Sequence, residues 1–105
     1  NIFFDTDQTK PTKGSVDSIN YLITYLRANP STKATLMGYA DETGTKAHNK
    51  RLSTNRAKNV KKIFMNAKIN GSRLEIVGNG EDTSVNKNST DARGIARRVT
   101  FKIMN

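Results

Sequence analysis

Apolar residues recur along this chain with two different periods, and the longer period predicts two helices. The first helix carries four apolar residues at helical spacing: Ile19, Leu22, Ile23 and Leu26. Ser15 or Asp17 can cap its start, and Asn29 is expected to end it because the residue before a proline disfavours helix. A longer helical pattern extends from about Thr45 to Asn66. The sequence thus predicts one short helix and one long one.

Four shorter apolar segments predict strands. They read NIFF (1–4), KATLMGY (33–39), RLEIVG (73–78) and RRVTFKI (97–103). The last segment alternates apolar and polar residues, as a strand with one buried face does. The order β-α-β-α-β-β predicts an α/β fold, an α+β sandwich in which both helices pack on one face of a mixed sheet. Strands that a helix connects are expected to run parallel.

Length and composition narrow the class of protein. A chain of 105 residues is expected to form a single domain, residues 1–105, with one core. It has no cysteine, which excludes disulfides and thiolate metal sites. Eighteen Lys plus Arg against nine Asp plus Glu give a net charge of +9, which favours an anionic partner. The apolar runs are too short to cross a membrane, and a chain that begins at Asn1 rather than methionine is expected to be part of a longer protein.

The long helix places an arginine within its apolar stripe. Leu52, Val60 and Ile63 share one helical face, and Arg56 lies between them, where the polar first half of that face changes to the apolar second half. One interpretation is a stem that packs while the guanidinium reaches solvent. The other is a guanidinium that the core holds and directs at a carboxylate. If Arg56 is a site residue, we expect the domain to fold without it and even to gain stability, because its loss relieves a charge on an apolar stripe.

Asp41 follows directly on the second predicted strand. Ligands of open α/β sheets bind outside the carboxyl ends of the strands, which makes this aspartate a candidate site residue, although a turn or cap aspartate is as common. Asp41 and Arg56 would lie near each other at the mouth of the same strand-turn-helix unit. One negative and one positive group side by side suit a zwitterionic ligand.

These residues belong to a longer pattern. The segment GYADETGTKAHNKRLSTNRAKNV resembles the signature of OmpA-like peptidoglycan-binding domains, in which G-H-T-D precedes a glycine and then N-x-x-L-S-x-x-R-A-x-x-V. Three further segments are similar to parts of the same family: FFDTDQT, GNGE and ARRVTFKI. The resemblance covers nearly the whole chain. It implies a binding domain with no catalytic residues, not an enzyme.

The resemblance also implies a ligand and the residues that hold it. In that family an aspartate and an arginine bind the amino and carboxylate groups of diaminopimelate in the peptide stem of peptidoglycan. Those roles fall to Asp41 and Arg56. Four further residues complete the implied ligand-binding set: Asn49 in support, Arg97 at the rim, Asp7 and Leu52.

By the same resemblance, the domain is expected in the periplasm as part of an outer-membrane protein that it anchors to the cell wall. The membrane anchor would be a barrel, a lipid or, with less support, a flagellar stator, and a homodimer stays open. We expect no cofactor, and no metal ion because neither His/Cys clusters nor spaced carboxylates form a ligand set. Three positions depart from the family pattern: Tyr39-Ala40 replaces His-Thr, Ala96 replaces Asn, and no proline follows Glu81.

Two other functions compete with this interpretation. The segment NIFFDTDQT also fits the strand plus D-x-D-x-T pattern of haloacid-dehalogenase-like phosphatases, with Asp5 as nucleophile and Asp7 as acid/base. Against it, Asn79 stands where that family's magnesium loop needs its first aspartate.

The other alternative is a basic nucleic-acid-binding module, suggested by the lysines of the long helix. Seven aromatic residues, none of them Trp, and no stacking motif speak against a nucleic-acid partner. His48 is expected to be a solvated helix residue.

Overall fold

The computed structural model describes residues 1–5, 7–40, 45–81 and 96–104. In these ranges the strands are β1 (Ile2–Phe3), β2 (Lys33–Ala40), β3 (Leu74–Glu81) and β4 (Arg98–Met104). The helices are α1 (Val16–Ala28) and α2 (Lys46–Asn66), and two short 3-10 turns, η1 (Lys13–Ser15) and η2 (Gly71–Arg73), precede α1 and β3. The predicted element order is confirmed.

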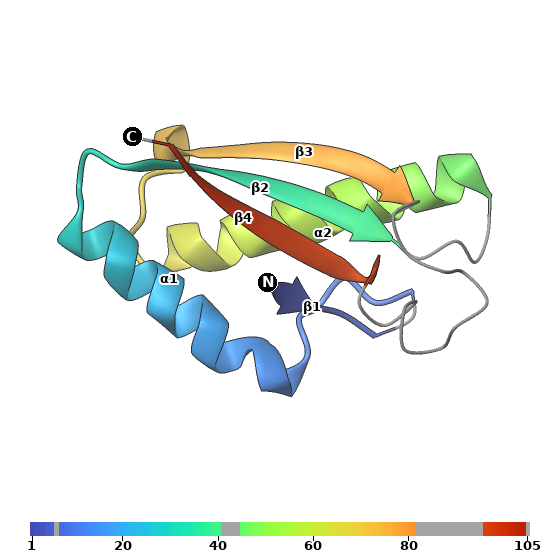
Figure 1. The fold of residues 1–105 in the computed structure, drawn as a ribbon, viewed down its shortest axis with the longest axis horizontal. Coiled ribbons are helices and arrows are strands. Elements are labelled where there is room, and N and C mark those ends of the chain that lie inside the picture. Colours follow the sequence, from blue (N-terminus) through green and yellow to red (C-terminus); the bar gives the residue numbers. More distant parts are fainter. Residues whose placement is uncertain (6, 41–44, 82–95, 105) are drawn as a thin grey trace.

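The strands form one mixed sheet in the order β1-β4-β2-β3, with both helices on one face (Figure 1). β2 and β3 run parallel, as predicted for two strands that α2 connects, and β4 runs antiparallel to both β1 and β2. β1 does not pair with β2, because β4 lies between them. The carboxyl ends of β2 and β3 therefore lie at the same end of the sheet as the start of β4.

The core lies between the sheet and the two helices. Ile2 of β1 and Phe4, which follows this strand, are buried, and Val60 is fully buried on α2. Leu52 and Ile63, the other apolar members of the predicted stripe, are half-buried. Further fully or nearly fully buried residues come from α1, the central strands and the end of α2: Ile19, Ile23, Leu26, Ala34, Leu36, Phe64, Leu74 and Val99.

Helix α2 lies close to the central strands, and two strand positions that lack side chains make room for it. A Cβ atom at Gly38 on β2 would overlap the backbone carbonyl of Ser53. A Cβ atom at Gly78 on β3 would overlap the side chain of Thr54. This close approach brings the polar first half of α2 against the carboxyl ends of β2 and β3. In the part of the chain that the structure describes, no helix is long and apolar enough to cross a membrane.

Candidate functional site

Arg56 is fully buried, with an exposed fraction of 0%. Its Nε donates to the carbonyl of Gln8 at 2.9 Å and its Nη2 to the carbonyl of Asp5 at 3.0 Å, both in the loop between β1 and α1. Its Nη1 donates to the carbonyl of Tyr39 near the end of β2, at 3.0 Å. The guanidinium also lies 5.1 Å from the centre of the Phe4 ring. One side chain thus joins three segments that are distant in sequence.

The burial of Arg56 contradicts the first interpretation of this residue, in which its head reaches solvent. A guanidinium can be kept inside a protein only if its N–H groups find acceptors, and three backbone carbonyls are among the acceptors here. The contact with an aromatic face adds favourable electrostatics. The core therefore holds Arg56, as the second interpretation requires.

Asp41, the predicted partner of Arg56, lies outside the described residues. The contact between Arg56 and the carbonyl of Tyr39 nevertheless places the guanidinium at the end of β2. Asp41 is two residues further along the chain, a span of at most roughly 7 Å. The structure therefore brings Arg56 to the strand end that leads into Asp41.

Asn49, one helical turn before Ser53, is 99% buried, with an exposed fraction of 1%. Neither the Oδ1 nor the Nδ2 atom of its amide has a hydrogen-bond partner among the described residues. A buried amide without partners costs free energy, so such a group needs an explanation, and a ligand or water that takes up its hydrogen bonds is one. Asn49 shares its helical face with Arg56, because seven residues make about two helical turns.

Asp7 contacts the start of α2 through a side chain that sequence reasoning missed. Its Oδ1 lies 3.0 Å from Nε2 of His48, which is 44% exposed. Asp7 has a φ of 57°, in the left-handed region that aspartate tolerates better than most residues. His48 is thus partly solvated, as predicted, but it also fastens the loop of Asp7 to α2. No sequence pattern marks this pair, because 41 positions separate the two residues.

Of the two remaining predicted residues, Arg97 contacts the segment that leads into the same loop. Arg97 is half-buried just before β4, and its Nε donates to the carbonyl of Phe4 at 3.0 Å. Leu52 is half-buried on α2. Ser53, which was not predicted as a site residue, receives a hydrogen bond from the Gly80 backbone at 2.8 Å and so holds the end of β3 against α2. The sequence contained one signal for Ser53, because this residue occupies the serine position of the N-x-x-L-S-x-x-R-A-x-x-V motif.

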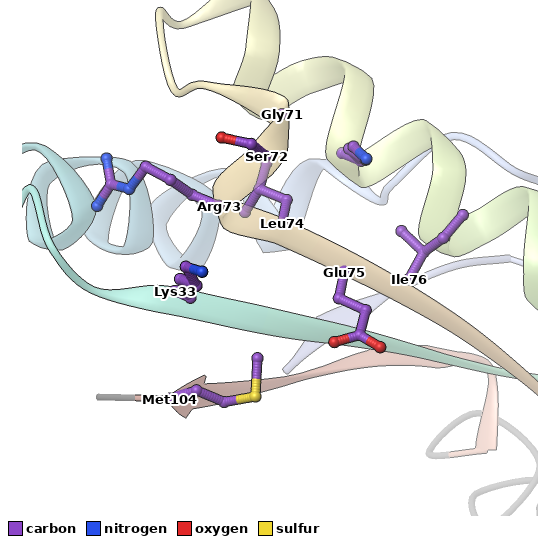
Figure 2. A pocket seen from close by; sticks show the side chains of 9 residues that line it. Lys33, Gly71, Ser72, Arg73, Leu74, Glu75, Ile76 and Met104 are labelled. Carbon is purple, nitrogen blue, oxygen red and sulfur yellow. The ribbon is translucent and has the colours of Figure 1, made fainter.

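A pocket lies at the end of the sheet that is opposite to Arg56, where β2 and β3 begin and β4 ends (Figure 2). It has a volume of about 500 Å³ and is lined by both charged and apolar side chains, among them Lys33, Glu75 and Met104. None of the predicted site residues lines it. No cluster of potential metal ligands occurs in the described ranges.

A mixed four-stranded sheet with two helices on one face, and a buried arginine at the carboxyl end of its second strand, defines the class of fold. A sequence model of the OmpA family matches residues 3–98. The chain therefore belongs to the OmpA family.

Individual relatives agree with this assignment. Outer membrane porin F of Pseudomonas aeruginosa is 36% identical over 102 residues, which cover 95% of this chain and 29% of that protein. The peptidoglycan-associated lipoprotein of Rhizobium meliloti is 29% identical over 84 residues, which cover 80% of this chain and 48% of that protein. The chain thus spans less than half of either relative.

Solved structures show the same fold. The peptidoglycan-associated lipoprotein from Burkholderia pseudomallei superposes with a TM-score of 0.91 at 20% identity, over 98% of this chain and 88% of that one. The C-terminal domain of Helicobacter pylori MotB superposes with a TM-score of 0.85 at 17% identity, over 99% of this chain and 82% of that one. At these identities the likeness concerns the fold alone.

Proposed function

We propose that this domain binds peptidoglycan without catalysis, through the diaminopimelate of the peptide stem, and so anchors an outer-membrane protein to the cell wall from the periplasm. The observation that carries the proposal is the position of Arg56. Its buried guanidinium donates to the carbonyl of Tyr39 near the end of β2, and Tyr39 is two residues before Asp41. The chain also belongs to the OmpA family.

The relatives support the wall as the target and the outer membrane as the place. Three of them are named peptidoglycan-associated lipoproteins, from Rhizobium meliloti, Agrobacterium fabrum and Legionella pneumophila. Porin F of Pseudomonas aeruginosa and Omp38 of Acinetobacter baumannii are named outer membrane proteins. Because lipoproteins and porins share this domain, its proposed wall-binding role would be the same in proteins whose membrane anchors differ.

The chemistry of the site suits diaminopimelate. The free end of this residue carries an ammonium and a carboxylate on one carbon, so Asp41 would accept from the first and Arg56 would donate to the second. A carboxylate is a stronger acceptor than the neutral carbonyls of Asp5 and Gln8, so it can take over N–H groups that now bond to the loop. The amide of Asn49 has both a donor and an acceptor to offer such a ligand.

The alternative functions receive less support. The phosphatase pattern needs Asp5 and Asp7 as catalytic residues, yet the Asp7 carboxylate contacts His48. β1 lies at the edge of the sheet and pairs antiparallel, in the fold of the OmpA family. The nucleic-acid alternative depends on the net charge of +9 and on the basic residues of α2, and exposed lysines on a helix are the usual solvated face.

A sedimentation experiment with purified cell walls tests the proposal. The unmutated domain is expected to sediment with walls that contain diaminopimelate and much less with walls that contain lysine at the same stem position. Asp41→Asn should remove this sedimentation, while Asp17→Asn, which changes an exposed residue of α1 by the same chemistry, should leave it intact. Equal sedimentation of both variants with both walls would contradict the proposed site.

A further inference from the structure

We propose that the loop between β1 and α1 forms a second subsite, which binds another carboxylate of the same stem peptide through Lys10 and Lys13. This inference rests on the proposed function, because it extends the ligand from diaminopimelate to the neighbouring residue of the stem. The inference is based on a pocket beside this loop. Arg97 is the one predicted ligand-binding residue among those that line it.

The pocket lies between this loop and the start of β4 and has a volume of about 620 Å³. Its lining residues are mostly polar or charged: Asp5, Gln8, Lys10, Pro11, Thr12, Lys13 and Arg97. Three of them carry a positive charge and one a negative charge. Because the whole chain has a net charge of +9, the surrounding field adds to this local excess. The pocket therefore favours an anionic group.

The two lysines are available to a ligand. Both are exposed, and the side chain of neither forms a hydrogen bond or ion pair within the described part of the chain. Arg97, by contrast, is half-buried and fixed by its hydrogen bond to the carbonyl of Phe4. The lysines would thus contact the anion directly, while Arg97 forms the floor beside them.

The loop that carries the lysines is held at several points. Thr12 N–H donates to the carbonyl of Phe3 at 2.9 Å, and the Thr12 and Ser15 hydroxyls lie 3.0 Å apart. Asn59 of α2 donates to the carbonyl of Thr9 at 2.6 Å, and Phe4 pairs with Pro11 in an isolated β-bridge. A loop fixed in this way loses little conformational entropy when it binds, which favours its use as a preformed binding surface.

The pocket adjoins the proposed diaminopimelate site. Asp5 and Gln8 line the pocket, and their backbone carbonyls accept hydrogen bonds from Arg56. The same stretch of loop therefore borders both Arg56 and the pocket, and we place the neighbouring residue of a ligand bound at Arg56 beside it. One of the two neighbours of diaminopimelate in the stem peptide is a glutamate linked through its side chain, which leaves its α-carboxylate free. This carboxylate is the group that we assign to Lys10 and Lys13.

Calorimetric titration with two soluble stem peptides tests the assignment. Both peptides contain diaminopimelate, and they differ only in whether the glutamate α-carboxylate is free or amidated. The unmutated domain should bind the free acid about two- to fivefold more tightly, the range expected for exposed ion pairs. Lys10→Gln combined with Lys13→Gln should bind both peptides equally. Lys58→Gln combined with Lys62→Gln removes the same charge from exposed positions of α2 and should keep the difference.

The outcomes separate the two proposals. If the unmutated domain binds both peptides with equal affinity, the second subsite is wrong and the proposed function stands. If it binds neither, the proposed function fails. If both double variants lose the preference equally, the effect comes from net charge rather than from the pocket, and the assignment to Lys10 and Lys13 is overturned.

Discussion

The charged side chain of Arg56 joins three segments of the chain through hydrogen bonds. Its carbonyl acceptors come from Asp5, Gln8 and Tyr39, and Phe4 covers one face of the guanidinium. Without this residue, those carbonyls would lose their donor inside the protein, and each unsatisfied buried polar group costs about 1 to 3 kcal/mol. Arg56 therefore has a structural role in addition to the proposed binding role.

This structural role changes the expectation for Arg56→Ala. The sequence suggests a variant that folds well, whereas the structure predicts a free energy of unfolding lower by about 3 kcal/mol or more, because acceptors and a cavity are left behind. Urea denaturation followed by circular dichroism measures the change. Arg51→Ala, at an exposed position of the same helix, should change the stability by less than about 0.5 kcal/mol. A loss below about 1 kcal/mol for Arg56→Ala would show that the guanidinium does not hold the loop.

The sequence could predict that Arg56 is special, but not what it contacts. Helical periodicity places an arginine in an apolar stripe, and this conflict marks it as a candidate. Its acceptors are backbone carbonyls, which every residue has and no sequence pattern distinguishes. The pairing of Asp7 with His48 was hidden for a related reason, since it depends on a loop conformation with φ of 57° at Asp7.

Helix α2 is the element on which the site is built. It provides Asn49, Ser53 and Arg56 from one face, and it lies against β2 and β3 because Gly38 and Gly78 leave room for its backbone and for Thr54. Helix and strand ranges could be predicted from periodicity to within a few residues. The sheet order could not, because β1 pairs with β4 across nearly the whole chain, and neither strand carries a local signal of its partner.

The close approach of α2 predicts an asymmetric response to added methyl groups. Gly38→Ala should lower the melting temperature by several degrees, because a Cβ atom there would overlap the backbone of Ser53 and a core tolerates overpacking poorly. Gly14→Ala is the matched control, since a Cβ atom at that position has no neighbour within 4 Å. Thermal unfolding followed by circular dichroism compares the two. Equal melting temperatures would mean that α2 does not lie as close to β2 as described.

At the scale of the whole molecule, the chain belongs to the OmpA family, and its net charge of +9 favours an anionic partner. The charge alone names no ligand, because nucleic acid and cell wall are both anionic. In the proposed function Asp41 and Arg56 make the distinction, since a zwitterionic residue would match such a pair and a phosphate backbone would not. Specificity in this account comes from a few fixed groups, while the overall field raises the rate of encounter.

The central claim is that Arg56 recognises the carboxylate of diaminopimelate. Calorimetric titration with three stem peptides, carrying diaminopimelate, its carboxamide or lysine, tests it most directly at one salt concentration. Binding should be tightest for the acid, weaker for the amide and weakest for lysine, with about ten- to a hundredfold between the first and the last. Arg56→Lys, which keeps the charge but lacks the planar fork, should reduce these differences while circular dichroism shows a folded domain. Equal affinity of the unmutated domain for all three peptides would contradict the claim.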